Sequence, residues 1–348
     1  MSELQCHRDG RNVKAEEKLA CGCTSFRIPS FCFFNCTLDF DNGVAWSLYD
    51  LFLFDKFSIS PAYITAPVDF IRNARVPIVI DLNGGLTANG TRVTSWAQTE
   101  WANATQFSAA NQLWLITPVP QTSDTYTVQN IRSGTFLDLS GSNSNNRTPI
   151  TGWANNNSNN QRWVIRTDRS GFYKFQNVAS STFMDLLNGG TANGTLITGW
   201  SGQWDATGES SHHQQWSLQR VSQRSTEVHS TLRRNPELSF DFQSYQVDAD
   251  YIILPEGIWR TIWNGSGLAS RSWRSEIFDF DDFAFVYKSA FATWSDDNIR
   301  ANGISTLCGI IFARARNDTD PGRAFNFNLN SGFNTVRFFG PQTNTFQV

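Results

Sequence analysis

The chain reads DLSGSNSNNRTPITGWANNNSNNQRW from Asp138 to Trp163, and this segment is the clearest copy of an internal repeat. Its anchors are an aspartate, a tryptophan fifteen residues later and a closing Gln-x-Trp. The same anchors, at the same aspartate-to-tryptophan interval, surround Asp81 and Asp185. One unit of about 50 residues therefore occurs three times between roughly residues 66 and 222. A unit of this length cannot bury its apolar face alone, so we expect the three copies to pack together.

Each copy has the pattern of β-hairpins. In the second copy, Tyr126-Thr127-Val128-Gln129-Asn130 is a β-rich run, and the apolar run Phe136-Leu137 ends at the aspartate. Short β-rich runs separated by turn residues predict hairpins. An asparagine follows each aspartate by eight residues, and in the first and third copies it begins an Asn-Gly pair, which favours a tight turn. Three such copies close most economically into an all-β barrel with pseudo-threefold symmetry and the Gln-x-Trp indoles in a shared core.

These motifs resemble the ricin-B-type β-trefoil lectins, and among them the fungal agglutinins that recognise galactose-containing glycans. The resemblance covers residues 66–222 and rests on three Gln-x-Trp triplets, each preceded by Asp and Trp at one mutual spacing. It implies a β-trefoil lectin domain over these residues.

The repeated side chains suit a sugar pocket. A galactose-type ring has one apolar face that an indole can cover, and its hydroxyls can donate charge-assisted hydrogen bonds to a carboxylate. The resemblance implies that the aspartates accept from hydroxyls, that the tryptophans stack, and that an Asn-Gln or His-Gln pair closes each site. The predicted carbohydrate-binding residues are Asp81, Trp96, Asn111 and Gln112 in the first copy, Asp138, Trp153, Asn160 and Gln161 in the second, and Asp185, Trp200, His213 and Gln214 in the third.

The three predicted sites differ in sequence. His213 stands where the other copies carry Asn, so the affinity or pH response of the third site is expected to differ. The turn after Asp138 lacks the Asn-Gly-Gly of the other two copies, so the second site is also open to question. We expect at least one weak site. A core role is favoured for the Gln-x-Trp tryptophans, and a functional role for the aspartates, because a buried carboxylate without a partner is costly.

The remaining composition indicates further domains. With 348 residues the chain is too long for one trefoil. A net charge of −3 offers no basic footprint for nucleic acid, and no apolar run is long enough to predict a transmembrane segment. Residues 1–65 are predicted to be an irregular N-terminal extension of unknown role. They hold five of the six cysteines at spacings that fit no zinc site well, and their polar start, unlike a signal peptide, predicts a cytoplasmic protein.

Residues 223–348 predict an α+β domain. Apolar residues at spacings of three and four, with acidic residues before them, describe an amphipathic helix; they are Phe283, Val286, Tyr287, Ala290, Phe291 and Trp294. A hairpin is predicted after it, with strands at 324–329 and 335–339. A helix followed by antiparallel strands is an α+β arrangement.

This segment resembles the C-terminal domain of the same fungal agglutinins, through residues 278–284, 322–326 and 340–343. The resemblance implies a papain-like cysteine-protease fold that also mediates dimerisation. Active members are expected to carry Cys, His and an acidic residue at positions that here hold Phe280, Arg323 and Gly340. None of these three can attack a substrate, shuttle a proton or orient a base. Cys308 lies in an apolar run and is predicted to be buried, so a pseudoprotease that forms a homodimer is expected.

Two alternatives remain open from the sequence. The carboxylates of Asp279, Asp281 and Asp282 could hold calcium, as the resemblance implies, or cap the predicted helix; no cofactor is predicted to be required. The predicted function is a lectin for galactose-containing glycans with up to three trefoil sites. The alternative is a glycan-targeted toxin of the cysteine-protease type.

Overall fold

A computed structural model of the chain describes residues 26–28, 31–33, 67–206, 209–236, 238, 244–245, 249–313 and 323–347. The chain forms two compact units, Met1–Ile59 and Ser60–Val348. In the first unit the described residues form an antiparallel hairpin of β1 (Phe26–Ile28) and β2 (Phe31–Phe33). The rest of the predicted extension, residues 1–65, lies outside the described residues.

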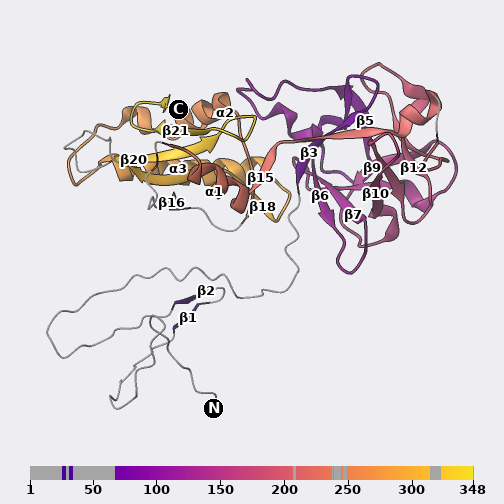
Figure 1. Ribbon diagram of the computed structural model, residues 1–348, viewed down its shortest axis with the longest axis horizontal. Coiled ribbons are helices and arrows are strands. Elements are labelled where there is room, and N and C mark those ends of the chain that lie inside the picture. Colours follow the sequence, from indigo (N-terminus) through magenta and orange to yellow (C-terminus); the bar gives the residue numbers. More distant parts are fainter. Residues whose placement is uncertain are drawn as a thin grey trace, which may run out of the picture. The chain divides into compact units, whose positions relative to one another are not determined.

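Twelve strands, four from each copy, form one antiparallel sheet that closes on itself (Figure 1). The closure comes from the last strand, which pairs with the first, Trp216 opposite Asn73. The predicted β-hairpin character is therefore confirmed. The strands are β3 (Val68–Asn73), β4 (Ile78–Leu82), β5 (Thr91–Ala97), β6 (Leu113–Pro118), β7 (Thr125–Asn130), β8 (Phe136–Leu139), β9 (Thr148–Trp153), β10 (Trp163–Thr167), β11 (Tyr173–Asn177), β12 (Phe183–Leu186), β13 (Ile197–Trp200) and β14 (Trp216–Arg220).

The Gln-x-Trp tryptophans form the centre of this sheet's core. Trp114, Trp163 and Trp216 are fully buried in one hydrophobic cluster. Their indole N–H groups donate to the carbonyls of Ile80 (3.2 Å), Leu137 (3.0 Å) and Met184 (3.2 Å), each of which directly precedes one of the predicted site aspartates. A buried indole N–H needs a partner, and here that partner fixes the strand that carries the carboxylate.

The described residues of the C-terminal half form two further sheets and three α-helices. One sheet has the order β15-β17-β18 and the other the order β16-β19-β20-β21-β22. Helix α3 lies along β20 (Figure 1), and Asn326 of β20 donates to the Ala284 carbonyl of α3 at 3.1 Å. The elements are β15 (Ser222–Arg224), α1 (Ser225–Arg233), β16 (Ser244–Tyr245), β17 (Asp250–Ile252), α2 (Glu256–Gly265), α3 (Phe280–Asn298), β18 (Ile304–Thr306), β19 (Gly309–Ala313), β20 (Arg323–Leu329), β21 (Val336–Gly340) and β22 (Thr345–Gln347).

The predicted helix and hairpin are both present in this half. Helix α3 buries Phe283, Tyr287 and Phe291, as its spacing predicted. Val286, which the spacing predicts to lie on the buried face, is 37% exposed, because it lies on the flank of the helix. Strands β20 and β21 pair antiparallel in the predicted hairpin.

The first copy of the repeat shares a hydrophobic core with the C-terminal half. Phe70 and Leu113 belong to the same buried cluster as Trp259 and Tyr287. A hydrogen bond from the Thr261 hydroxyl to the Thr105 carbonyl at 2.8 Å joins the same regions, and one from the Arg300 amide to the Ile131 carbonyl at 2.9 Å joins the C-terminal half to the second copy. This part of the sheet is therefore packed on both of its sides.

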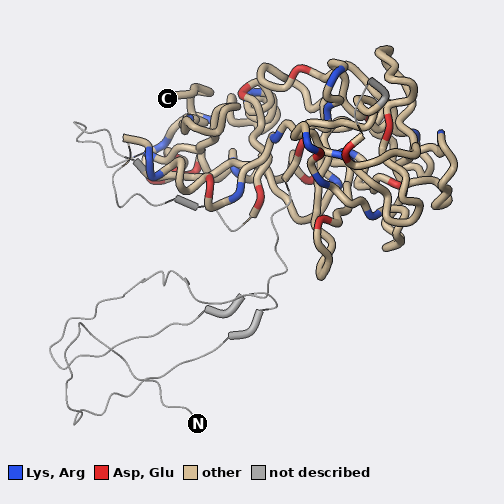
Figure 2. Tube along the Cα trace, turned by 45° about the vertical axis from the view of Figure 1, so that its right-hand side comes forward, with Lys and Arg blue, Asp and Glu red and all other residues tan. Residues whose placement is uncertain are grey.

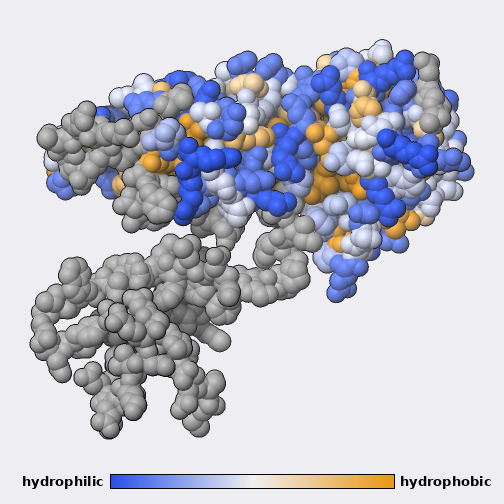
Figure 3. All heavy atoms as spheres, in the orientation of Figure 1, coloured by the Kyte–Doolittle hydropathy of each residue, from blue (hydrophilic) through white to orange (hydrophobic). Residues whose placement is uncertain are grey.

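The surface of the described residues is mainly polar. Lys and Arg are interspersed with Asp and Glu along the chain (Figure 2), and the face in Figure 3 is largely hydrophilic with a few groups of hydrophobic residues. Two of the large apolar side chains that remain exposed are Trp96 and Trp153, which the sequence predicts as sugar-stacking residues. Among the described helices, none combines the length and apolarity needed to cross a membrane.

Candidate functional site

The predicted aspartates occupy equivalent positions in the three copies. Asp81, Asp138 and Asp185 are the next-to-last residues of β4, β8 and β12, and each is at most 4% exposed. A short 3-10 helix follows each strand: η1 (Asn83–Gly85), η3 (Ser140–Ser142) and η5 (Leu187–Gly189). The chain thus turns sharply just after each carboxylate.

Amide side chains hold the first two carboxylates. Asp81 Oδ2 accepts from Asn111 Nδ2 at 2.7 Å and from Gln112 Nε2 at 3.0 Å. Asp138 Oδ2 accepts in the same way from the Asn160 amide at 2.9 Å and the Gln161 amide at 3.0 Å. These amides come from η2 (Ser108–Gln112) and η4 (Asn159–Gln161). Both donors bind one oxygen, and Oδ1 accepts no hydrogen bond from the described residues.

The third carboxylate has one fewer donor. Asp185 Oδ2 accepts from Gln214 Nε2 of η6 (Glu209–Gln214) at 3.1 Å. His213 packs instead against the backbone of Gly189, whose φ is +60°, so close that a Cβ there would collide with the imidazole. Within the described residues, His213 makes no hydrogen bond to Asp185. The replacement of asparagine by His213 therefore removes one amide donor from the aspartate of the third site.

Burial and donor number set the electrostatics of the three carboxylates. Desolvation raises the pKa of Asp81 and of Asp138, and their amide donors work against that rise. Desolvation raises the pKa of Asp185 to about 7, and Gln214 is the donor that opposes it. The pKa of His213 is lowered, first by burial and then by the neighbouring His212. Near neutral pH the third site thus has a carboxyl at its titration midpoint.

The turn after the aspartate has one conformation in all three copies. Each contains two successive residues with left-handed φ, namely Gly84 (+61°) and Gly85 (+60°), Gly141 (+62°) and Ser142 (+56°), and Asn188 (+54°) and Gly189 (+60°). The second copy therefore keeps the geometry although it lacks the Asn-Gly-Gly sequence. The missing Asn-Gly-Gly sequence therefore does not change the backbone conformation at the second site.

The register places each tryptophan beside its aspartate. Trp96, Trp153 and Trp200 pair with the residue two positions before the aspartate on the neighbouring strand. Side chains alternate along a strand, so the indole and the carboxylate are diagonal neighbours on one face of the hairpin. Trp96 is 44% and Trp153 40% exposed. Trp200 is half-buried, and the Arg147 guanidinium lies 5.9 Å from its ring centroid.

One glutamine in each copy connects the aspartate to the tryptophan. The side-chain amide that donates to the aspartate also donates to the carbonyl of the residue directly after the tryptophan. These bonds are Gln112 to Ala97 (3.1 Å), Gln161 to Ala154 (2.9 Å) and Gln214 to Ser201 (3.2 Å). The structure therefore brings Asp, Gln and Trp of each copy into one constellation.

The second constellation borders a polar cleft of about 1020 Å³. Ala154 and Asn155, which follow Trp153, line one part of it, and Asp296 and Asp297 of α3 line another. Beside this site the C-terminal half thus supplies polar side chains next to the trefoil-like sheet.

The positions predicted for a lost protease triad lie at ends of elements. Phe280 is the first residue of α3, and Arg323 is the first residue of β20. The Arg323 guanidinium lies 5.0 Å from the centroid of the Phe280 ring, a cation–π distance. Gly340 ends β21, which pairs antiparallel with β20, so Gly340 and Arg323 lie at the same end of neighbouring strands. The contact is chemically inert, because neither side chain can act as nucleophile or base.

Cys308 is a buried thiol between β18 and β19. It is 1% exposed, and burial raises its pKa to about 12. The thiolate is the reactive form of cysteine, so this residue is poorly suited to nucleophilic chemistry. The predicted burial is confirmed.

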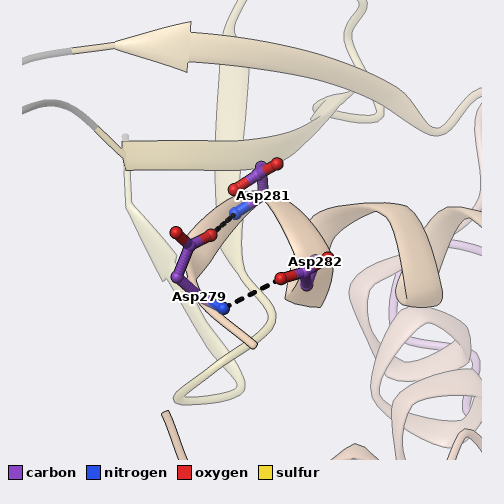
Figure 4. A group of neighbouring side chains, drawn as sticks. All are labelled: Asp279, Asp281 and Asp282. Carbon is purple, nitrogen blue, oxygen red and sulfur yellow. Dashed lines mark hydrogen bonds between the residues drawn. The ribbon is translucent and has the colours of Figure 1, made fainter. Parts of the chain in front are cut away.

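Asp279, Asp281 and Asp282 lie together at the N-terminus of α3, where Asp279 and Asp282 form a capping box (Figure 4). The Asp279 carboxylate accepts from the Asp281 amide at 3.3 Å, and the Asp279 amide donates to Asp282 Oδ2 at 3.0 Å. One oxygen from each of the three carboxylates lies within 4.8 Å of the others. A hydrogen bond between the Asp281 and Asp279 side chains, together with burial, raises the pKa of the Asp281 carboxyl. Calcium takes six to eight oxygen ligands, so the cluster fits part of such a coordination sphere.

Two family models match the chain. Residues 251–346 match Agglutinin C-terminal, and residues 110–200 match Ricin-type beta-trefoil lectin domain-like. A comparison with curated protein sequences found no match.

Two solved structures share about a third of their residues with the chain. A structure of PSL1a in complex with E64 is 34% identical, with a TM-score of 0.69, over 81% of this chain and 94% of that one. The lectin of Polyporus squamosus, bound to the human-type influenza-binding epitope Neu5Aca2-6Galb1-4GlcNAc, is 35% identical, with a TM-score of 0.70, over the same shares of both chains.

The fold and the matches define a mostly-β, carbohydrate-binding lectin with a trefoil-like ricin-B domain and a C-terminal region that contains helices. The chain belongs to the fungal ricin-B-type agglutinins that carry an agglutinin C-terminal domain. The resemblance found in the sequence is confirmed.

Proposed function

We propose that the protein binds galactose-containing glycans through up to three sites, one in each copy of a pseudo-threefold trefoil over residues 66–222. The observation that carries this proposal is the glutamine that joins each aspartate to the segment of its tryptophan. The epitope bound by the Polyporus squamosus lectin contains a galactose unit, which supports the same class of ligand here.

Each site would recognise the sugar through the free oxygen of a carboxylate that the amide donors hold in place, and through one indole. The amide donors hold Oδ2, so Oδ1 is left to accept from hydroxyls of the ring. A hydrogen bond to a charged group is worth about 1.5–3 kcal/mol. The indole covers the apolar face of the ring. Because two amide donors preorganise Asp81 and Asp138, we expect the first and second sites to bind more tightly than the third.

A glycan array followed by calorimetry with lactose tests this function. We expect galactose-terminated and galactose-containing glycans to bind and Asp138→Ala to remove one of the binding events. Asp138→Asn keeps the side-chain volume and isolates the effect of charge. Asp124→Ala changes an exposed aspartate of the same copy and is the matched control. An array on which no galactose-containing glycan is retained would overturn the proposal.

We propose further that residues 223–348 form a papain-like domain without protease activity, which serves as a dimerisation scaffold. Support comes from the start of α3 facing the start of β20, an arrangement that in an active enzyme would hold a nucleophile against a base. Phe280 and Arg323 cannot perform these roles. Apolar side chains exposed in this half, such as Trp273 and Phe285, offer contact area for a second subunit.

The alternative function, a glycan-targeted cysteine protease, would need a thiol that the described C-terminal half does not expose. Incubation with a casein-type substrate and a thiol-directed probe distinguishes the two functions. Turnover of casein together with labelling of Cys308 would favour the enzyme, and the absence of both is expected for the lectin.

A further inference from the structure

Three Asn-x-Thr turns, here called the bracketing turns, follow the predicted sugar-binding aspartates. They are Asn89-Gly90-Thr91, Asn146-Arg147-Thr148 and Asn193-Gly194-Thr195. The threonine hydroxyl closes each turn by donating to the carbonyl three residues earlier, on Ala88 (2.6 Å), Asn145 (2.6 Å) and Ala192 (2.7 Å). The threonine of each Asn-x-Thr sequence therefore stabilises its own turn. The asparagine side chain takes no part in closing that turn and is available for contacts outside it.

Each bracketing asparagine reaches into a different copy. Its Oδ1 accepts from the backbone amide directly after the stacking tryptophan of that copy. The bonds run from Ala154 to Asn89 (2.7 Å), from Ser201 to Asn146 (2.7 Å) and from Ala97 to Asn193 (2.8 Å). The first copy thus contacts the second, the second contacts the third, and the third contacts the first.

A second hydrogen bond fixes the other side of the same tryptophan. The amide of the residue after each bracketing asparagine donates to the carbonyl of the residue directly before the tryptophan. These bonds join Gly90 to Gly152 (3.0 Å), Arg147 to Gly199 (3.0 Å) and Gly194 to Ser95 (2.7 Å). The backbone on both sides of each tryptophan is consequently held by another copy.

The bracket leads directly to the carboxylate. Ala154 donates its amide hydrogen to Asn89 and accepts from Gln161 at its carbonyl, and Gln161 also donates to Asp138. The same path runs from Asn146 through Ser201 and Gln214 to Asp185, and from Asn193 through Ala97 and Gln112 to Asp81. In each site, the backbone next to the tryptophan and the side chain of the aspartate are therefore positioned by an asparagine of another copy.

We infer that every sugar site is a composite of two copies, in which Asn89, Asn146 and Asn193 are positioning residues for the sites of the second, third and first copies, respectively. This inference rests on the proposed galactoside binding. Its consequence is that a change in one bracketing turn weakens the site of the next copy and leaves the site of its own copy intact.

The residue after the bracketing asparagine also shapes the neighbouring site. A Cβ on Gly90 would lie 3.7 Å from the Trp153 ring, so glycine keeps that indole open. Arg147 takes this place in the second turn and covers part of Trp200. One face of the Trp200 ring is consequently partly covered by a residue that the second copy supplies.

Amide hydrogen exchange tests these hydrogen bonds between copies without any sugar. In the full chain labelled with ¹⁵N, we expect Asn89→Ala to speed exchange of the Ala154 amide by about tenfold, the equivalent of one hydrogen bond. The Ala97 and Ser201 amides should not change. Asn146→Ala should act on Ser201 alone and Asn193→Ala on Ala97 alone. Equal acceleration of all three amides, or none, would overturn the inference.

Calorimetry with lactose provides the second arm. In a background with Asp81→Ala and Asp185→Ala, which leaves the second site, Asn89→Ala should weaken binding by about tenfold. Asn89→Asp keeps the acceptor oxygen and should restore affinity, which a purely structural role would not predict. Asn193→Ala in the same background is the control and should have no effect.

The two arms separate the possible failures. If the wild type binds no galactoside but the Ala154 amide responds to Asn89→Ala alone, the proposed function fails and the composite architecture stands. If lactose binds and Asn89→Ala leaves its affinity unchanged, the positioning role is refuted while the function stands.

Discussion

At position 213 a histidine replaces the asparagine of the other two copies, and Asp185 therefore keeps one amide donor. A buried carboxylate depends on its donors to remain charged, which is why the pKa of Asp185 rises to about 7. The exchange of one side chain thus alters both the hydrogen bonding and the charge of the carboxyl at this site.

Replacing His213 by asparagine is expected to repair the third site. His213→Asn should add a donor to Asp185, lower its pKa and raise lactose affinity by about two- to tenfold, the range of one hydrogen bond. Calorimetry in a background with Asp81→Ala and Asp138→Ala measures this site alone. The reverse change, Asn160→His, should weaken the second site, and unchanged affinity in both variants would contradict the argument.

Asp185 should also make the stability of the protein depend on pH. Its pKa is 3.8 as a free group and about 7 when folded, so the folded state favours the protonated form. The stabilisation is complete below about pH 4 and is lost as the pH rises through 7. Urea unfolding should show Asp185→Asn to be more stable than the wild type at pH 8. Asp69, whose pKa rises to about 6, leaves a smaller dependence of the same sign in the variant.

The residues of each site could be predicted because their order repeats at a fixed interval. Aspartate, tryptophan and Gln-x-Trp act within one copy, where spacing along the chain reflects distance in space. The contact of Arg147 with Trp200 and the reach of Asn89 to Ala154 join different copies. No local pattern records such pairs, so the sequence indicates the bracketing asparagines as turn residues and as Asn-x-Thr sequons, but not as positioning residues.

Among the elements, α3 follows its sequence most closely. Its N-terminus carries a capping box in which the Asp279 carboxylate accepts from the Asp281 amide. Helix α2 was not predicted. Its buried residues Ile258, Trp259 and Ile262 are β-branched or aromatic, types that favour strands as well as buried helices. Packing against α3, where Trp259 contacts Phe291 at 4.8 Å between ring centroids, decides in favour of the helix.

Removing the cap of α3 should destabilise the protein. Asp279→Ala is expected to lower the free energy of unfolding by about 1 kcal/mol, because an N-cap side chain satisfies a backbone amide. Chemical denaturation measures the change. Asp279→Asn retains a capping oxygen and should lose much less, whereas equal losses in both variants would assign the effect to charge.

Calcium binding at the same carboxylates remains a prediction. If Asp279, Asp281 and Asp282 hold the ion, calorimetric titration of the full chain should give a heat of binding that Asp281→Asn removes. Magnesium serves as the control cation, since it demands shorter, octahedral coordination. A titration without heat would leave the cluster with its capping role alone.

On the scale of the molecule, the first copy and the C-terminal half share one core. The sequence predicted separate domains at 66–222 and 223–348 from a change of pattern at about residue 223. It did not predict this shared packing, because Phe70 and Trp259 are far apart in sequence and each is compatible with its own local core. Long-range packing of this kind becomes visible only when the elements are assembled.

The proposed dimer should appear in solution. Light scattering after size exclusion is expected to give about twice the mass of 39.2 kDa. Phe285→Asp and Trp273→Asp place charge on exposed apolar positions of the C-terminal half and should shift the mass toward the monomer. Thr122→Asp is the control, because it places the same charge in an exposed loop of the second copy and should leave the mass unchanged. Phe107→Asp would not serve, because Phe107 packs on Trp294.

The bracketing turns form a ring of three, and a ring has no terminal member. Deleting any copy would leave one site without its bracket and one bracket without a site, so a two-copy fragment would lose more than a third of its binding capacity. A circular permutant that opens the loop at 120–124 and joins the ends of the sheet would keep all six bracketing hydrogen bonds between copies. Sugar binding should therefore depend less on the order in which the copies are connected along the chain than on the presence of all three.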